Sequence, residues 1–190
     1  MKRTIRLGVL ALVAVSALAL VSAAIAHRIV VIKGTNQSET LTGTTGSDLV
    51  FAKAGDDTVN AGEGNDRVHG MRGNDTLNGE GGNDRVRGGT GNDTINGGEG
   101  NDVLRGRWGN DVVNGDNGDD RIWVGRGADV ENGGAGNDRM HALARDRMVD
   151  SIDCGPGDKD VVWLNSKESD VYVNCEIVKT VTTSHPDDGE

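Results

Sequence analysis

A period of nine residues, which runs without insertion or deletion over residues 43–141, limits the fold of this chain more than any other feature. Written in rows of nine, the stretch gives eleven rows, each with Gly at the fourth position and Asp at the sixth. The eighth position is apolar in every row except one, where it is Glu131. So strict a period predicts a stack of similar units that are too small to fold singly and bury one continuous core together.

The composition agrees with a thin core. The 190 residues include 30 Gly, whereas only 35% are hydrophobic and 3% aromatic. Too few large side chains are present for a thick apolar core, and each Gly adds chain entropy that folding must overcome. A conventional enzyme domain is therefore disfavoured. The formal net charge of −10 disfavours a nucleic-acid partner and favours a cation.

Each row combines a Gly-rich turn with a three-residue strand whose middle side chain, at position eight, faces inward. The fourth-position glycines allow restricted backbone conformations and let carbonyl oxygens converge. The Asp two residues later adds a carboxylate, and such a group of oxygens suits Ca²⁺. The candidate metal ligands are Asp48, Asp57, Asp66, Asp75, Asp84, Asp93, Asp102, Asp111, Asp120, Asp129 and Asp138. The turn glycines expected to offer carbonyls are Gly46, Gly55, Gly64, Gly73, Gly82, Gly91, Gly100, Gly109, Gly118, Gly127 and Gly136.

A second period, of 18 residues, lies inside the first. From the second row to the eleventh, position nine is Asn in the even rows, whereas in the odd rows it is His, Arg or Trp. The alternation predicts two units per coil, with even rows in one parallel sheet and odd rows in the other. A meander of antiparallel strands is the alternative, because Asn-Gly pairs such as those at 78–79 and 96–97 are also hairpin signals. Such hairpins need neither the second Gly nor the repeated Asp.

The rows GGTGNDTIN at 88–96 and GGEGNDVLR at 97–105 resemble the RTX, or haemolysin-type, calcium-binding nonapeptide repeat. The resemblance extends over residues 43–141 and implies an all-β, right-handed parallel β-roll with small capping segments. In this family each ion lies between turns two units apart, held by Asp side chains and turn carbonyls. Eleven units would then give at most about nine such Ca²⁺ sites. Asp160, in a later segment that partly regains the pattern, is a further candidate ligand.

The ends of the chain differ from the repeat. Residues 1–26 combine a basic start, an apolar run and Ala24-Ile25-Ala26, which is typical of a bacterial secretory signal peptide; a membrane anchor is the alternative. Cleavage would leave no membrane span and a secreted chain. We expect residues 27–42 to form an N-terminal cap with a decayed repeat, and 142–190 a C-terminal cap with a disordered tail. The two cysteines, Cys154 and Cys175, would form a disulfide in an exported protein.

One row of the repeat is defective. In residues 124–132 Glu131 takes the inward position, and Val124 and Ala128 replace the usual Gly and Asn. Either the strand slips so that Val130 faces inward, or this coil is locally distorted.

No catalytic signature occurs: the sequence contains no H-E-x-x-H, G-x-S-x-G, P-loop or G-x-G-x-x-G stretch. We therefore expect a non-catalytic structural or surface-adhesion protein that binds and folds on calcium, its oligomeric state unspecified. An alternative is a module that binds anionic polysaccharide or a cell surface through a basic face; an ice-binding protein or an accessory subunit of a secreted enzyme is less favoured. The candidate anion-binding residues are Arg67, Arg85, Arg87, Arg105, Arg121 and Arg139.

Overall fold

The computed structural model of the protein describes residues 29–144 and 146–182. The sequence-predicted signal peptide and the C-terminal tail lie outside these residues. Every helix or strand element of the described chain is a β-strand. The strands are β1 Val30–Lys33, β2 Thr40–Thr44, β3 Asp48–Ala54, β4 Thr58–Gly62, β5 Arg67–Arg72, β6 Thr76–Gly81, β7 Arg85–Thr90, β8 Thr94–Glu99, β9 Val103–Trp108, β10 Val112–Asn117, β11 Arg121–Arg126, β12 Val130–Asn132, β13 Arg139–Ala142, β14 Ser151–Asp153, β15 Val161–Asn165, β16 Val171–Val173 and β17 Ile177–Val181.

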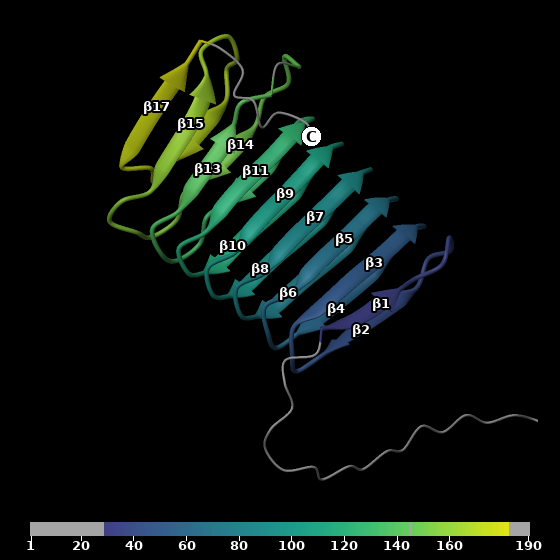
Figure 1. The fold of residues 1–190 in the computed structure, drawn as a ribbon. Coiled ribbons are helices and arrows are strands. Elements are labelled where there is room, and N and C mark those ends of the chain that lie inside the picture. The colour runs from purple at the N-terminus through teal and green to yellow at the C-terminus, as the bar shows by residue number, and fades with distance from the viewer. Residues whose placement is uncertain (1–28, 145, 183–190) are drawn as a thin grey trace, which may run out of the picture.

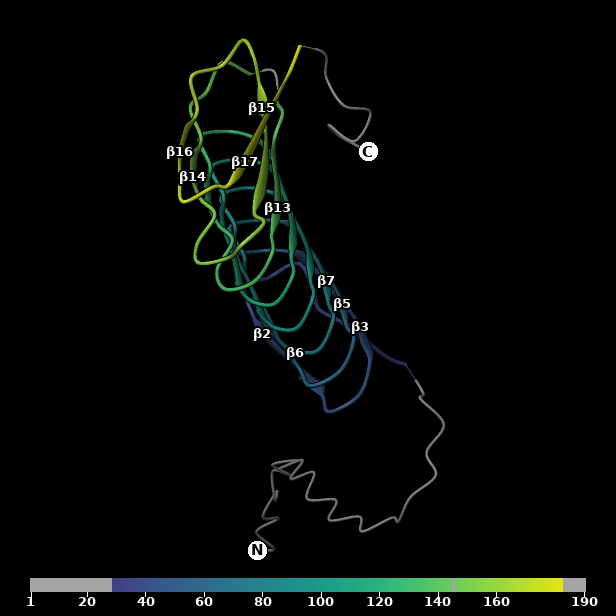
Figure 2. The ribbon, with the colours of Figure 1, turned by 90° about the vertical axis from the view of Figure 1, so that its left-hand side faces the viewer.

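The strands alternate between two sheets along the chain. The odd-numbered strands form a nine-stranded sheet and the even-numbered strands an eight-stranded sheet, each in sequence order. Within each sheet the neighbouring strands are parallel, and in the regular part each residue pairs with the residue 18 positions later, as Val86 does with Leu104. Figures 1 and 2 show the resulting stack of flattened coils, with one strand of each sheet per coil. This confirms the parallel β-roll; the antiparallel meander is wrong.

The core is a thin layer between the sheets. The eighth position of each regular row except the one with Glu131 supplies an apolar side chain, and the residues from Val50 to Met140 at this position are fully buried. Successive coils place these side chains in register, as in the series Val59, Leu77, Ile95 and Val113. Each buried aliphatic side chain contributes about 1.5–3 kcal/mol, so stability is collective rather than a property of one unit.

The strands are longer than the three residues expected from the sequence. Most strands in the middle of the roll have six residues and continue through the first three positions of the next row, as in β7 and β9. The second of these positions takes a positive φ even where it is not Gly, for example 84° at Met71 and 94° at Arg107. The ladder across neighbouring coils therefore holds residues that have little preference for a strand by themselves.

Glu131 lies in the core without any shift of register. It pairs with Val113 on one side and Ile152 on the other, and its side chain is 0% exposed, whereas Val130 is 38% exposed. Within the described chain, neither carboxyl oxygen of Glu131 has a hydrogen-bond partner. The slip that would have turned Val130 inward does not occur, because β12 is held between β10 and β14 in the middle of the sheet.

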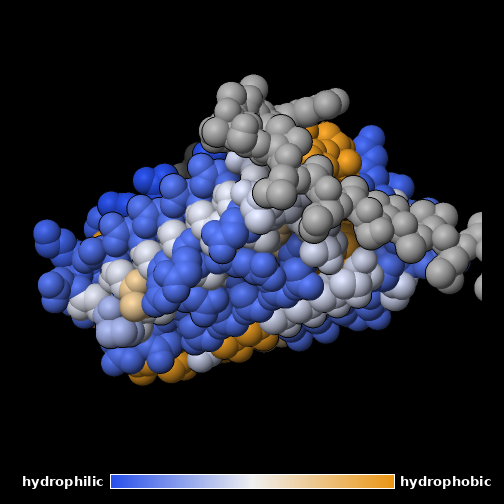
Figure 3. All heavy atoms as spheres, turned by 90° about the horizontal axis from the view of Figure 1, so that it is seen from below, coloured by the Kyte–Doolittle hydropathy of each residue, from blue (hydrophilic) through white to orange (hydrophobic). Residues whose placement is uncertain are grey.

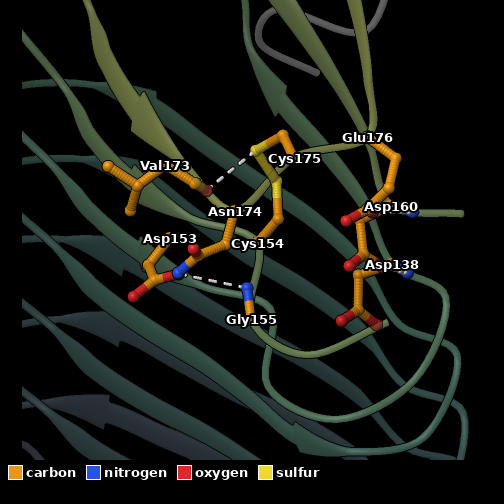
Figure 4. Close-up of a disulfide and its surroundings, with 9 residues drawn as sticks. All are labelled: Asp138, Asp153, Cys154, Gly155, Asp160, Val173, Asn174, Cys175 and Glu176. Carbon is orange, nitrogen blue, oxygen red and sulfur yellow. Dashed lines mark hydrogen bonds between the residues drawn. A yellow bond between two sulfur atoms is a disulfide. The ribbon is translucent and has the colours of Figure 1, made fainter. Parts of the chain in front are cut away.

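The C-terminal coils continue both sheets after the regular repeat ends. Cys154 follows β14 and Cys175 follows β16, and the two residues form the expected disulfide between neighbouring coils (Figure 4). Asn174 reinforces this link by donating a hydrogen bond of 2.7 Å from Nδ2 to Asp153 Oδ1. The division of the chain into caps and roll at residues 42 and 142 stays a prediction.

The face of the roll seen from below is mostly polar. In the view of Figure 3, hydrophilic residues cover most of the surface and hydrophobic residues form a few separate patches. The described residues include no helix that is long and apolar enough to cross a membrane.

Candidate metal centre

The repeated aspartates lie in two rows, one before the strands of each sheet. Asp48, Asp66 and their equivalents precede or begin the odd-numbered strands, and Asp57, Asp75 and theirs precede the even-numbered strands. All eleven side chains are at most 2% exposed. Buried carboxylates require either a partner or a proton, so their surroundings decide what they can do.

One carboxylate oxygen of each aspartate after the first coil joins its coil to the preceding one. The backbone N–H of Asp48 donates to Asp66 Oδ1 at 2.7 Å, and the same contact links nine pairs among the eleven aspartates. The described chain thus carries the regular 18-residue pairing on which the sequence-based limit of nine sites rested. The number of ions is a separate quantity that these pairs leave open.

The second carboxylate oxygen has no protein partner. In the described residues, Oδ2 of every repeated aspartate from Asp57 to Asp138 is buried and makes no hydrogen bond. A buried oxygen of this kind is costly unless a cation or a proton joins it. The row of orphaned oxygens is therefore the feature that points to a bound ion.

First-position glycines leave room beside these oxygens. A Cβ atom on Gly97 would overlap Asp102 Oδ2 and would lie 2.6 Å from the carbonyl oxygen of Gly115 in the next coil. A carboxylate oxygen and a backbone carbonyl thus border the same small space, and equivalent contacts surround Gly70 and Gly106. Carboxylate and carbonyl oxygens are the donors that Ca²⁺ prefers, so the donor set fits this ion.

The fourth-position glycines allow the turns of neighbouring coils to touch. All of them except Gly46 have a positive φ. A Cβ on Gly91 would overlap the Gly73 carbonyl oxygen and lie 3.1 Å from Asn74 Oδ1. A side chain at this position would therefore push the turns apart and remove their carbonyls from the edge where the carboxylates lie.

Three rows lack the first-position glycine. Ala52, Ala61 and Val124 stand there instead, and all three are fully buried. Because they stand at the position of the glycines, we expect their side chains to occupy the space that the glycines leave open beside the aspartate of the same row, which is Asp57, Asp66 or Asp129. We therefore expect the eleven rows to be unequal as cation sites, although the fourth and sixth positions are identical in all of them.

Both rows of carboxylates continue beyond the regular repeat. Asp160 accepts from the Asp138 N–H at 2.8 Å and extends one row, after which Glu176 accepts from Asp160 (Figure 4). In the other row Asp150 accepts from Asp129, and Asp170 accepts from Asp150. The sequence interpretation included Asp160 but missed the other three residues, because the spacing changes from 18 to 21, 22, 20 and 16. An Asp-x-apolar signal at 150–152 and 170–172 identifies two of them.

Burial raises the pKa values of these carboxyl groups. The pKa of Asp93 rises to about 7, and the pKa values of Asp111 and Asp120 rise to about 8, with desolvation as the largest cause and neighbouring aspartates as a further one. Backbone hydrogen bonds act in the opposite direction. For Glu131, burial raises the pKa well above its ordinary value. A bound cation would remove both the repulsion and the need for protons.

Side chains alone do not form a metal cluster here. Among the described residues, no group of three or more His, Cys, Asp or Glu side chains lies close enough to hold an ion. The carboxylates are spread along the stack, one per coil and edge. A cation at either edge would therefore depend on backbone carbonyls as well as on the aspartates, as the contacts around Gly97 indicate.

A comparison with protein-family models matches the RTX calcium-binding nonapeptide repeat over residues 33–68, 61–95, 78–113, 87–122 and 105–140. The chain belongs to this RTX repeat family. RTX nonapeptides are calcium-binding motifs, which agrees with the donor set at the two edges and supports a Ca²⁺-binding structural module. Among curated proteins, no significant match is found.

The arginines of the RTX roll lie on the outer face of the nine-stranded sheet. Arg67, Arg85, Arg121 and Arg139 are aligned in one row of this sheet, and Arg87 and Arg105 belong to a parallel row two residues later. The second row also holds stacked rings: His141 lies 4.8 Å from Trp123 and 4.4 Å from Trp163, between ring centroids. The sequence thus correctly places the basic residues on one sheet.

The eight-stranded sheet carries the Asn row. Each Asn Nδ2 donates to the Oδ1 of the Asn in the preceding coil, at 2.6–2.8 Å, from Asn78 to Asn132. Such a ladder satisfies the amides along the stack. The regular Asn row therefore has a structural explanation that requires no ligand such as ice.

Proposed function

We propose that the chain is an exported Ca²⁺-binding protein that folds on extracellular calcium and acts as a non-catalytic structural or surface-adhesion module. The observation that carries this proposal is the row of buried, unpartnered Oδ2 atoms, most of which lie beside a first-position glycine. The RTX family supports calcium as the cation. RTX repeats are typical of extracellular bacterial proteins, and the Cys154–Cys175 disulfide is compatible with an oxidising environment.

The proposed ligands are the eleven repeated aspartates, with Asp150, Asp160 and Asp170 as extensions of the two rows. Carbonyl oxygens of the Gly-rich turns would complete each site. When bound, Ca²⁺ supplies positive charge that neutralises the two carboxylate rows. At most about nine ions would occupy the regular roll, fewer if Ala52, Ala61 and Val124 weaken their sites.

The chain's own residues explain why folding would depend on the ion. At neutral pH, carboxylates brought to successive coils repel one another, and the 30 Gly add chain entropy to be overcome. One buried aliphatic side chain per unit opposes these terms only weakly. Neutralisation at the edges allows the Asp N–H to Oδ1 contacts to form and the aliphatic side chains to stack.

The basic face supports a second candidate function, the binding of an anionic polysaccharide. In the described chain, Arg67, Arg85, Arg87 and Arg105 make no ion pair with a carboxylate. Their positive charge therefore stays available on a protein whose net charge is −10. Phosphate, sulfate and carboxylate groups are the partners that guanidinium groups bind most strongly.

A calcium titration of residues 27–190, with the disulfide intact, tests the main proposal. Far-UV circular dichroism should show a cooperative gain of β-structure with Ca²⁺, reversed by chelator and weak with Mg²⁺. An unchanged spectrum together with no bound calcium by metal analysis would contradict it. Folding without calcium, but with calcium bound, would restrict the ion to a stabilising role.

A further inference from the structure

A hollow of about 320 Å³ lies on the outer face of the nine-stranded sheet, over the carboxyl-terminal halves of β5, β7 and β9. Its sides are formed by His69, Met71, Arg72, Arg87, Arg107 and Trp108. The hollow belongs to neither row of repeated aspartates, and no carboxylate side chain lines it. Its size is at the lower end of the range of about 300–1,000 Å³ found for small-ligand sites.

The strand register explains why the sheet is hollowed here. Gly89 of β7 pairs with Met71 on one side and Arg107 on the other. The next residue, Thr90, similarly separates Arg72 from Trp108. Short residues on the middle strand thus lie between long side chains on both neighbouring strands. Because the flanking residues are fixed by the ladder, the hollow is part of the folded sheet rather than a feature of a loop.

Positive charge gathers in this hollow without neutralisation. Burial and the nearby Arg105 and Arg107 lower the pKa of Arg87, and burial with Arg87 and Arg107 lowers that of His69. Within the described residues, the side chains of Arg72, Arg87 and Arg107 form no ion pair with a carboxylate. Like charges held together in this way repel one another, and a bound anion would relieve the repulsion.

Apolar surface lies next to the charge. Met71 is 47% exposed and Trp108 is 48% exposed, although both side chains are large and apolar. The Arg126 guanidinium lies 4.8 Å from the centre of the Trp108 ring and holds this ring at the side of the hollow. A ligand that fits both surfaces would combine an acid group with a compact body that has an apolar side.

We propose that this hollow binds one acid-bearing sugar unit of an acidic polysaccharide, with its carboxylate or sulfate on Arg87 and Arg107 and its ring against Met71 and Trp108. The inference rests on the second candidate function and assigns it a site. A saccharide fits better than a nucleic acid, because acid groups separated by uncharged rings require only one basic hollow. A nucleic acid carries closely spaced phosphates, so those beyond the hollow would lie over the rest of an acidic protein and be repelled.

Isothermal titration of the calcium-loaded protein tests this site. The probes are a hyaluronate hexasaccharide, a chondroitin sulfate hexasaccharide and the methyl-esterified hyaluronate hexasaccharide; a single-stranded DNA hexanucleotide represents phosphate. The two acidic saccharides distinguish carboxylate from sulfate as the bound group. We expect at least one of them to bind and the esterified form to bind at least about tenfold more weakly than hyaluronate if the carboxylate is the bound group.

Two charge-matched variants separate the hollow from the rest of the basic face. Arg87→Ala with Arg107→Ala should weaken saccharide binding at least about tenfold, because two charged hydrogen-bond donors are lost. Arg121→Ala with Arg139→Ala removes the same charge from the same sheet outside the hollow, and should weaken binding by no more than about threefold. Trp108→Ala should also weaken binding, without any change of charge. Circular dichroism in calcium checks that each variant is folded.

The outcomes distinguish the site from the function on which it rests. Equal losses for the two double variants would overturn the hollow but leave saccharide binding by the face as a whole. No binding of either acidic saccharide by the wild-type protein would overturn both, whereas calcium binding would be unaffected. DNA binding as tight as saccharide binding would overturn the saccharide assignment.

Discussion

Gly97 leaves room for two oxygen atoms that a methyl group would displace. Gly97→Ala is expected to remove about one bound Ca²⁺, because its Cβ would overlap Asp102 Oδ2 and approach the Gly115 carbonyl. The backbone itself tolerates Ala, since Gly97 does not have a positive φ. Metal analysis of the folded protein measures the change. Gly46→Ala is the control, because the nearest atom to its Cβ would be 3.9 Å away; equal calcium contents for the two variants would contradict the site.

Glu131 places a carboxyl group where every other regular row has an apolar side chain. Glu131→Val should raise the free energy of unfolding by about 1–3 kcal/mol, because it removes a buried polar group that has no hydrogen-bond partner in the described chain. Urea unfolding in calcium at constant pH measures this. Glu131→Gln, which keeps a buried polar group, is the matched control, and its free energy of unfolding should rise less than that of the Val variant. A loss of stability in the Val variant would mean that the carboxyl group has a partner, such as an ion, in solution.

At the scale of the element, the disulfide links the coils of β14 and β16. Cys154→Ser with Cys175→Ser should destabilise the C-terminal coils by about 3 kcal/mol, because the unfolded chain gains conformational entropy when the cross-link is removed. In a stack where each coil contacts mainly its neighbours, this loss should remain local. Hydrogen exchange should therefore quicken in β13 to β17 and stay unchanged in β3 to β7. Equal effects along the whole stack would show that the roll unfolds as one unit.

The elements also show which parts of the fold the sequence could predict. The nine-residue pattern was sufficient for the inward positions, because these depend only on alternation along a strand, and the 18-residue alternation at position nine was sufficient for the two sheets and their faces. Strand length was underestimated, since Gly-rich positions such as 88–90 have little strand preference without neighbouring coils. The hollow beside Trp108 depends on those same positions and could not be foreseen.

The candidate site was predicted less completely than the fold. The repeated aspartates followed directly from the period, but Asp150, Asp170 and Glu176 did not, because longer or shorter connections before them break the spacing. Glu131 was placed correctly at the inward position, and of the two outcomes expected there, a strand slip or a local distortion, the slip was wrong. Pairing on both sides of β12 outweighs the free energy of burying one carboxyl group, and the group can take up a proton.

At the scale of the whole molecule, stability should depend on pH in opposite ways with and without calcium. The pKa values of Asp93, Asp111 and Asp120 are raised from 3.8 to about 7, 8 and 8 in the ion-free roll, which therefore binds more protons than the unfolded chain. Their contribution to the stability of the ion-free roll is full below about pH 4 and is lost as pH rises through 7 to 8. The ion-free roll should be more folded at pH 5 than at pH 8.

Calcium reverses this dependence of stability on pH, because the ion binds the deprotonated carboxylates and releases protons. The apparent calcium affinity should fall as the pH decreases from 8 to 6, and calcium addition at pH 7 in weak buffer should acidify the solution. Circular dichroism with chelator and calcium titrations at the two pH values measure both effects. Ion-free stability that increased from pH 5 to pH 8 would contradict the assignment of these pKa values.

The alternation of strands between two sheets also restricts how such a gene can change in length. Loss or duplication of 18 residues would shorten or lengthen the roll by one coil and leave both faces intact. Loss of nine residues would exchange the sheets for everything that follows, so the Arg rows downstream would lie beside the Asn ladder. The irregular spacings after Asp138 keep each strand in its own sheet, because the connections absorb the extra residues. Repeat number in such a chain is therefore free to change in pairs of nonapeptides, and a single unit is gained or lost only with a change of face.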